Sequence, residues 1–363
     1  MKRLKDFEKD LNKCSKCGLC QAACPLYRMT ANECVVSKGK FIMLHGVTKG
    51  DLKLSKNINK YLDMCLKCGK CNNFCPSGID VCQILNTAKY EYMKTTFVNK
   101  FVKFVQSRLV FSNVISVFDL ISKPFRKPFK SVSKSALRLV YFKGCVNRIF
   151  PQNDNYINKI FKNSNIEIIT PKFDCCGLPF LSEGNMERFV EVAYHNMKQL
   201  NVDYDYFVTD CASCESTISD YKNYIDCDNF VNSEKSINWG DLIVQSNMKF
   251  KFRKPLKVTF HKPCHLKSDT FFEKIMANCE NVEYVKMTDY DSCCGLSGTF
   301  SVKNFNLSQK LIMQKAQNII DTNADVVITV CPACVLGLKQ GLLLSGSKIK
   351  VKSLLEFLSE GVE

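Results

Sequence analysis

Polar and apolar positions follow different patterns in the first quarter and the last two thirds of the chain. The first 96 residues are rich in helix formers, and helices are expected over residues 1–13, 40–45, 53–62 and 79–93, the first of them short and polar. From residue 135 onward, short runs of β-branched and aromatic residues alternate with helical segments. Such alternation predicts parallel sheets, so the expected fold is an α+β multidomain protein with an α-helical first domain followed by α/β domains.

The alternating part divides into two units with the same order of elements. The first predicts strands at 137–142, 166–169 and 206–209 and helices at 153–163 and 183–200. The second predicts strands at 257–260, 282–287 and 325–330. We therefore expect domains at 1–96, 135–250 and 251–363, with a connector at 97–134.

Ten cysteines in the two units form one pattern that occurs twice. Each copy has a lone cysteine, a Cys-Cys-Gly run after 28 or 29 intervening residues, and a C-x-x-C pair after another 33 or 35 intervening residues. The two sets are Cys145, Cys175, Cys176, Cys211 and Cys214, and Cys264, Cys293, Cys294, Cys331 and Cys334. Each group follows the carboxyl end of a predicted strand, where open α/β sheets bind their ligands.

Five thiolates in each copy exceed the four that a zinc ion takes, and adjacent cysteines suit neighbouring irons better than one ion. The spacing therefore indicates two iron–sulfur clusters of unusual ligation. The alternative is one cluster and one degenerate structural copy that holds zinc. Both copies keep all five cysteines, which favours the first interpretation.

A different cysteine pattern lies in the helical first domain. The run C-x-x-C-x-x-C-x-x-x-C-P occurs at residues 14–25 and again at 65–76. It is the bacterial-ferredoxin pattern, in which three close thiolates bind one [4Fe–4S] cubane and the fourth binds the other. The crossed assignment gives Cys14, Cys17, Cys20 and Cys75 to one cluster, and Cys65, Cys68, Cys71 and Cys24 to the second. Structural zinc sites use paired C-x-x-C motifs, so zinc is the weaker alternative.

The cysteine content indicates a reducing compartment. The chain has 363 residues and 22 cysteines, and no signal-peptide segment follows its first residues. Short gaps between cysteines suit metal ligation better than disulfides, and ligation requires thiolates. No apolar run approaches the roughly 20 residues that span a bilayer, so a cytoplasmic protein is expected, soluble or peripheral on the inner face of the cell membrane. Cys34, Cys82, Cys227 and Cys279 belong to neither pattern and are expected to be small buried residues.

The connector carries much of the net charge of +16. It has one acidic residue, Asp119, and eight basic ones: Lys100, Lys103, Arg108, Lys123, Arg126, Lys127, Lys130 and Lys134. Apolar residues at steps of three and four over 97–109 predict an amphipathic helix. A basic amphipathic helix is typical of contact with an anionic membrane, and docking on a neighbouring domain is the alternative. No nucleic-acid-binding motif accompanies the charge, so no nucleic acid is expected as a partner.

Several of these segments together resemble one known family. They are Gly144-Cys145, the runs at 174–177, 210–214 and 260–265, Cys293-Cys294-Gly295-Leu296-Ser297-Gly298-Thr299-Phe300, and the run at 331–334. Over essentially its whole length the chain resembles the CCG-domain iron–sulfur oxidoreductases. That family includes the C subunit of anaerobic glycerol-3-phosphate dehydrogenase, the iron–sulfur subunit of glycolate oxidase and the B subunit of heterodisulfide reductase. The resemblance implies one or two noncubane [4Fe–4S] clusters at the five-cysteine sets, beside the two cubanes.

The resemblance and the motifs together lead to two functional expectations. No G-x-G-x-x-G run opens a helix, so neither flavin nor NAD is expected on this chain. The leading expectation is an iron–sulfur electron-transfer subunit. It would take electrons from an FAD-containing dehydrogenase of glycerol 3-phosphate or a 2-hydroxy acid such as lactate or glycolate, and pass them toward a quinone or another carrier. The alternative is a thiol–disulfide reductase with catalytic CCG clusters. A structural hydrogen bond is the expected role of His265, and the alternative is a proton donor or a hydrogen bond to a cluster sulfur.

Overall fold

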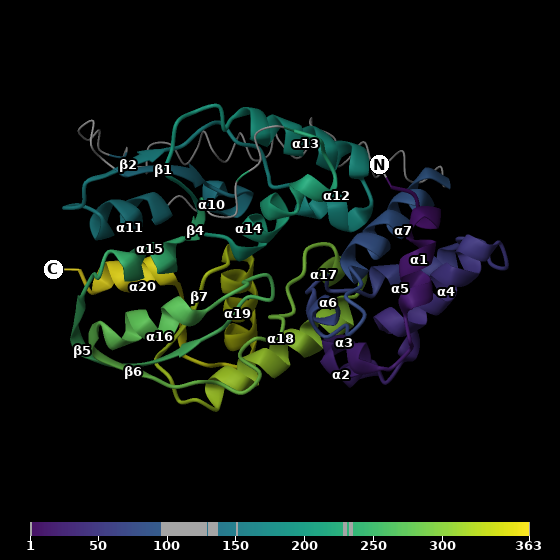
Figure 1. Ribbon diagram of the computed structural model, residues 1–363. Coiled ribbons are helices and arrows are strands. Elements are labelled where there is room, and N and C mark those ends of the chain that lie inside the picture. Colours follow the sequence, from purple (N-terminus) through teal and green to yellow (C-terminus); the bar gives the residue numbers. More distant parts are fainter. Residues whose placement is uncertain are drawn as a thin grey trace.

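The computed structural model describes residues 2–95, 129, 137–149, 152–227, 231 and 235–362. These residues form a helical N-terminal part and two α/β halves, and the helical part lies against both halves (Figure 1). The predicted basic connector lies outside the described residues, apart from Phe129, whose ring packs edge-on against Tyr141. Among the described helices, none has the length and apolarity needed to cross a membrane.

Short helices make up the N-terminal part, as expected. They are η1 (Leu4–Phe7), α1 (Glu8–Lys13), α2 (Leu19–Ala23), α3 (Pro25–Thr30), η2 (Glu33–Val35), α4 (Ser37–Lys49), α5 (Lys56–Asp63), α6 (Lys70–Asn73) and α7 (Val81–Thr95). Ser55 accepts a hydrogen bond from the Ile58 N–H and so caps α5. The first segment is not the polar helix that was predicted. Leu4, Phe7 and Leu11 are buried in the core of this part, because one face of η1 and α1 is apolar.

Each half contains a four-stranded parallel sheet, in the order β2-β1-β3-β4 and β6-β5-β7-β8. The first half comprises β1 (Leu137–Phe142), α10 (Cys145–Ile149), α11 (Gln152–Ile160), β2 (Ile166–Ile169), α12 (Leu178–Glu183), α13 (Met186–Lys198), β3 (Tyr206–Thr209), α14 (Ala212–Ser219), η4 (Tyr221–Asn223), β4 (Ser236–Asn238) and α15 (Trp239–Gln245). The second comprises β5 (Phe250–Phe260), α16 (Thr270–Ala277), β6 (Cys279–Tyr284), α17 (Phe300–Lys303), α18 (Phe305–Ile320), β7 (Val326–Thr329), α19 (Pro332–Leu344), β8 (Lys350–Ser353) and α20 (Leu354–Glu360). The identical strand order confirms the internal repeat.

The structure differs from the sequence-based expectation at a few element boundaries. The helix expected over 183–200 is α13, which begins three residues later than expected, because left-handed Gly184 ends the preceding α12 and the Asn185 side chain caps α13. Strand β5 begins seven residues earlier than expected, at Phe250, and pairs with β6 across an irregularity in register. The edge strands β4 and β8 are short and were not predicted.

The two halves share one hydrophobic core. It contains Tyr141 and Trp239 from the first half and Phe260 and Phe357 from the second, and all four side chains are buried. The rings of Tyr141 and Trp239 meet edge to face with centroids 5.6 Å apart. Helix α20 of the second half lies beside α11 of the first, and α16 of the second half lies beside α15 of the first (Figure 1). The halves therefore form one packed unit, which fixes their cysteine-bearing ends relative to each other.

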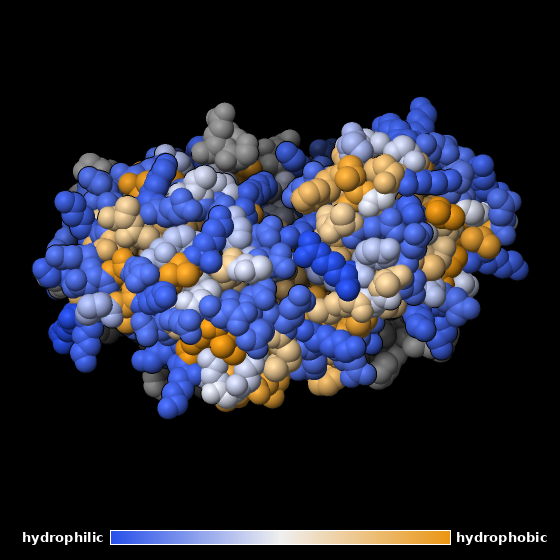
Figure 2. Space-filling view, turned by 90° about the horizontal axis from the view of Figure 1, so that it is seen from below, coloured by the Kyte–Doolittle hydropathy of each residue, from blue (hydrophilic) through white to orange (hydrophobic). Residues whose placement is uncertain are grey.

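The helical part meets the first half at a close backbone contact. A Cβ atom on Gly184, whose φ is +78°, would lie 2.7 Å from the carbonyl carbon of Lys89 in α7. Only glycine accommodates both the left-handed conformation and the approach of α7. The face shown in Figure 2 is largely hydrophilic, and its hydrophobic residues lie in separate small patches.

Candidate metal centres

All ten repeat cysteines line one cavity of about 260 Å³. The cavity lies at the carboxyl ends of the strands, since Cys145, Cys211, Cys264 and Cys331 follow β1, β3, β5 and β7. The helical part closes it with residues that include Cys65 and Lys89. The structure thus brings together the two five-cysteine sets, which lie far apart in the sequence.

The two Cys-Cys-Gly runs form the same turn. Gly177 has φ +85° and Gly295 has φ +90°, and each donates its backbone N–H to the sulfur two residues earlier, over 3.5 Å to Cys175 and 3.4 Å to Cys293. In the first half, Cys175 Sγ lies 3.8 Å from Cys145 Sγ. These backbone donors favour the thiolates of Cys175 and Cys293, but the hydrogen bond with the next cysteine and burial outweigh them and raise the pKa of both thiols.

Neighbouring thiols shift the acidity of equivalent cysteines in the same direction. Hydrogen bonds from Cys175 and Cys214 lower the pKa of Cys176 well below its usual value. Hydrogen bonds from Cys293 and Cys334 lower the pKa of Cys294 to about 5. In both halves, therefore, the second cysteine of the Cys-Cys-Gly run is the one whose thiolate is favoured.

The two sets meet across the boundary between the halves. The Ala212 N–H donates to the Val330 carbonyl over 3.2 Å, and Ser213 Oγ lies 3.8 Å from Cys331 Sγ. Ser213 also lies 2.8 Å from His265 Nδ1, while His265 Nε2 lies 2.9 Å from the Lys67 carbonyl. Both ring nitrogens of His265 are engaged, so this residue joins the three parts of the fold, which confirms the structural role expected for it.

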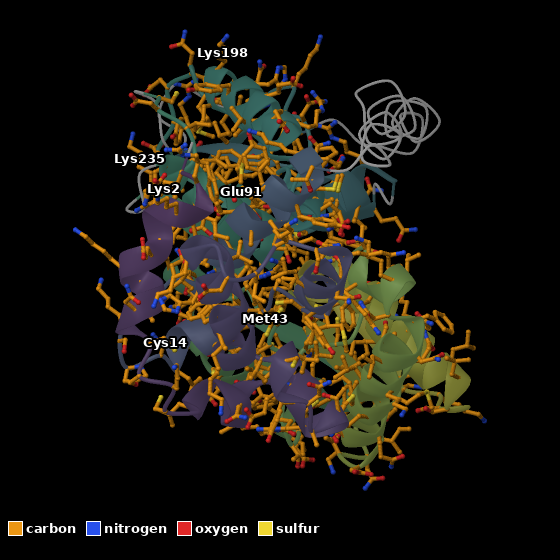
Figure 3. The ribbon with its side chains drawn as sticks, turned by 90° about the vertical axis from the view of Figure 1, so that its right-hand side faces the viewer. Lys2, Cys14, Met43, Glu91, Lys198 and Lys235 are labelled. Carbon is orange, nitrogen blue, oxygen red and sulfur yellow. The ribbon has the colours of Figure 1, made fainter. Side chains whose placement is uncertain are left out.

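The ferredoxin cysteines gather in two groups. Cys14, Cys17, Cys20 and Cys75 line one small cavity, together with Cys71. Burial raises the pKa of Cys24, and the charge of the nearby Cys65 thiolate raises it further. Cys17 is exposed, and Cys14 lies at the outer edge of the helical part in Figure 3. The fourth cysteine of each run therefore lies near the other run, as the crossed pattern requires.

The second ferredoxin group adjoins the second half. Cys24 and Cys68 pack against the apolar cluster that contains Cys293, and burial and the nearby Cys264 thiol raise the pKa of Cys68 well above its usual value. Ser297 Oγ donates to the Leu66 carbonyl over 2.7 Å and holds the two parts together. Thiol groups therefore follow one another from the surface at Cys17 to the shared cavity.

The four remaining cysteines are only partly as expected. Cys279 is buried, whereas Cys34, Cys82 and Cys227 keep intermediate exposure. The Cys82 thiol lies beside Cys71, because α7 begins immediately next to that ligand candidate, and their hydrogen bond raises the pKa of Cys82. Cys34, Cys82 and Cys227 are therefore partly buried, and of these Cys227 packs against the core of the first half.

Two buried polar residues beside the second set were not singled out in the sequence. His261 is fully buried, and its ring and the sulfurs of Cys294 and Cys334 lie within 4.8 Å of one another. Burial lowers the pKa of His261 to about 3. Lys315 on α18 is also buried, and burial lowers its pKa to about 8, against the effect of the nearby thiols of Cys293 and Cys294. The sequence did offer a signal for both, because a histidine and a lysine stand at positions where a core-facing pattern predicts apolar residues.

A cluster of ion pairs lies at the rim of the cavity. Glu183 of the first half accepts bonds from Lys89 over 3.4 Å and from Lys303 over 2.5 Å, and Asp63 lies 2.8 Å from Lys89. The cluster draws on the helical part and on both halves, and Thr299 donates a further hydrogen bond to Glu183. Burial acts to raise the pKa of Glu183, and the two lysines outweigh it, so its pKa is about 2.

The described residues fit iron–sulfur ligation. The cavity is lined by ten thiols, and a Cβ on Gly144 would come within 3.0 Å of Cys214 Sγ, so this glycine keeps the space beside that sulfur open. Thiolates in such numbers and at such spacing are the ligands of iron–sulfur clusters.

Comparison with protein families gives the same assignment. The model of the cysteine-rich domain CCG matches residues 139–219 and again 258–339, and the model of the 4Fe-4S dicluster domain matches residues 10–79. The family models therefore match the helical part and both copies of the repeat.

Similar proteins cover nearly all of the chain. The probable glycolate oxidase iron-sulfur subunit of Bacillus subtilis is 22% identical, over 95% of this chain and 92% of its own length. A fumarate reductase (CoM/CoB) subunit of Methanothermobacter marburgensis is 26% identical, over 96% and 72%. The glycolate oxidase iron-sulfur subunit of Escherichia coli is 21% identical, over 97% and 94%.

A solved structure supports the fold alone. The crystal structure of a hypothetical protein from Helicobacter pylori matches 99% of this chain and 75% of its own, with a TM-score of 0.55 and 10% identity. The motifs, the family models and the relatives agree on an iron–sulfur subunit of an oxidoreductase. The chain belongs to the CCG-domain iron–sulfur oxidoreductase family.

Proposed function

We propose that the chain is the electron-transfer subunit of a flavoprotein dehydrogenase acting on a 2-hydroxy acid or glycerol 3-phosphate. The observation that carries this proposal is the succession of thiol groups from exposed Cys17, past Cys68, to the cavity lined by both repeat sets. The relatives named as glycolate oxidase iron–sulfur subunits support the substrate class. The partner would carry FAD, and the electrons would continue to a quinone or another carrier.

The proposed ligands are those of the sequence patterns. They are Cys14, Cys17, Cys20 and Cys75 for one cubane, Cys65, Cys68, Cys71 and Cys24 for the other, and the two five-cysteine sets for one or two further clusters. When bound, such clusters pass single electrons between donor and acceptor. The protein fixes their separation, excludes water and sets the local charge. Domains at 1–96, 135–250 and 251–363 are part of the same proposal.

The arrangement of the cubane sites gives the proposed route a direction through the fold. The group with exposed Cys17 lies nearer the surface, so a partner can approach it there. The group with Cys24 and Cys68 lies against Cys293 of the second half. Electrons would therefore enter or leave at the first group and reach the cavity through the second.

A second candidate function is thiol–disulfide reduction in the cavity. The observation that favours it is that both five-cysteine sets line the same cavity, and the relative named for CoM/CoB aligns with nearly the whole chain. The reaction would take two electrons and two protons and convert one disulfide into two thiols. Electrons delivered through the cubane sites would supply the reducing equivalents.

Contact with an anionic membrane surface is a further part of the proposal. It rests on the eight basic residues of the connector, since each Lys or Arg near such a surface contributes about 1 kcal/mol. Replacing Lys123, Arg126, Lys127 and Lys130 by Gln should weaken sedimentation with anionic liposomes. Unchanged sedimentation would mean that the connector has another role, such as docking on a neighbouring domain.

The deciding experiment is metal analysis with EPR on anaerobically purified protein. Four clusters would give about 16 irons per chain and no zinc. Reduction of these clusters by a flavoprotein dehydrogenase and its 2-hydroxy acid, detected by EPR, would support the leading proposal. A new paramagnetic signal after addition of a disulfide would instead favour the reductase. About 8 irons, with or without zinc, would leave the repeat halves as structural domains and refute the route through the cavity.

A further inference from the structure

His261 occupies an unusual position for a polar side chain. It follows β5 directly, its side chain is fully buried, and neither Nδ1 nor Nε2 makes a hydrogen bond of normal geometry to a described residue, although the Tyr290 backbone lies near the ring. Buried polar groups in folded proteins are nearly always paired, so an unpaired ring at such a place calls for a ligand as its partner. His265, four residues later, has both nitrogens engaged and needs no further partner.

The ring of His261 faces two sulfurs of the second five-cysteine set. One ring nitrogen and the sulfurs of Cys294 and Cys334 all lie within 4.8 Å of one another. The three residues come from the end of β5, the Cys-Cys-Gly turn and the first turn of α19, so three separate elements converge on this point. A nitrogen and two thiolates at such distances are a ligand set for a thiophilic transition metal.

The first half has no nitrogen at the corresponding place. His261 precedes Cys264 by three residues, and the residue that precedes Cys145 by three is Phe142. Phe142 packs against the rings of Phe173 and Phe207, with centroids 4.9 and 6.1 Å away. The repeat therefore keeps its cysteines in both halves, but the first half has an apolar ring where the second has an imidazole.

We propose that His261 is a nitrogen ligand of the metal centre in the second half, on the side of Cys294 and Cys334, and that the centre in the first half has sulfur ligands only. The inference rests on the proposed presence of a metal in the second half. If the imidazole takes the place of one of the five thiolates as a ligand, it removes negative charge from the centre and raises its reduction potential, as in Rieske clusters. Electrons from the adjacent cubane site would then reduce the centre in the second half preferentially, because that centre has the higher reduction potential.

The test uses the full chain, purified without oxygen after growth with either natural or ¹⁵N-labelled histidine. Pulsed EPR of the reduced protein should show strong nitrogen couplings of a metal-bound imidazole, which change to the ¹⁵N pattern on labelling. The His261→Gln variant should lose them and shift the potential of one centre downward. The matched His265→Gln variant, which changes a histidine that is already hydrogen-bonded, should keep them. If the second half holds zinc, X-ray absorption at the zinc edge should show the same nitrogen.

Two results would overturn the inference. One is a fully metallated wild-type protein with neither a histidine coupling in pulsed EPR nor a nitrogen ligand at the zinc edge, a readout that does not depend on whether a variant folds. The other is a coupling that survives in His261→Gln. Failure of the proposed function can be told apart from failure of this inference. A protein that shows the histidine coupling but takes no electrons from a dehydrogenase would contradict only the proposed function.

Discussion

Lys303 Nζ lies 2.5 Å from Glu183 Oε2, and the two residues belong to different halves of the repeat. Lys89 of the helical part lies 3.4 Å from the same carboxylate, and Asp63 lies 2.8 Å from Lys89. Three parts of the fold are therefore joined by one network of charges at the rim of the cavity. The Glu183 side chain is only 6% exposed, so loss of its charge would leave a largely buried lysine partly unpaired.

Replacing Glu183 by Gln should destabilise the protein by about 3 kcal/mol at pH 7. The folded-state pKa is about 2 and the ordinary value 4.5, and each unit of difference corresponds to about 1.4 kcal/mol. Denaturation in urea, followed by circular dichroism, measures the difference. The control is Glu191→Gln, which removes an exposed partner of Arg188 and should change stability by less than about 1 kcal/mol.

The same pair of variants gives a pH dependence with a definite sign. The pKa of Glu183 is lower in the folded state, so its contribution is fully present above pH 4.5 and is lost as the pH falls toward 2. The stability gap between wild type and Glu183→Gln should shrink by roughly half between pH 7 and pH 3. A gap of equal size at both pH values would show that the carboxylate does not derive its effect from the two lysines.

The position of Gly184 yields a prediction about how the helical part docks. Gly184→Ala adds a methyl 2.7 Å from the Lys89 backbone as well as strain at φ +78°, and should cost more than about 3 kcal/mol. Gly346→Ala is the matched control. Its φ is +66°, and no described atom lies within 4 Å of the added methyl, so it should show the backbone strain alone, about 1 kcal/mol. Equal losses for the two variants would mean that α7 moves away freely.

The cysteine repeat and most of the strand positions could be predicted from the sequence, because both depend on local spacing. Strands β1, β2 and β3 match the predicted ranges, since each is a short apolar run bounded by turns. The break at Gly184 could not be predicted in this way, because the close approach of α7 is a long-range contact. The shared cavity likewise depends on how the two halves pack, and no spacing within one half encodes that packing.

The cysteines of the candidate site could be predicted from the sequence, but its buried histidine and lysine could not. Cysteine gaps report directly on ligation, whereas His261 is a single histidine after an apolar strand and resembles an ordinary core residue in the sequence. Only burial without a hydrogen-bond partner, beside Cys294 and Cys334, distinguishes it. Lys315 is similar, since only the fold places that lysine of α18 next to Cys293.

Removing the charge of Lys315 should lower the reduction potential of the centre in the second half. A buried cation near Cys293 and Cys294 stabilises the more negative, reduced state. Lys315→Met should shift the midpoint potential downward by ~60 mV, which corresponds to a tenfold change in a one-electron equilibrium. Lys310→Met, on the exposed side of the same helix, should leave the potential within about 10 mV. A titration followed by EPR measures both, and equal shifts would exclude a local effect of Lys315.

Serine variants of the fourth ferredoxin cysteines test the crossed ligation. With crossed ligands, Cys75→Ser damages the cubane of Cys14, Cys17 and Cys20 near the surface, and Cys24→Ser damages the cubane beside the second half. In the proposed arrangement the second cubane would lie beside the centre at Cys293, so their unpaired spins should interact when both are reduced. Cys75→Ser should therefore keep that interaction in the EPR spectrum, while Cys24→Ser should abolish it. Both variants should lose up to about four irons, which controls for general damage. The opposite pattern, in which Cys75→Ser abolishes the interaction, would mean that each run ligates its own cluster.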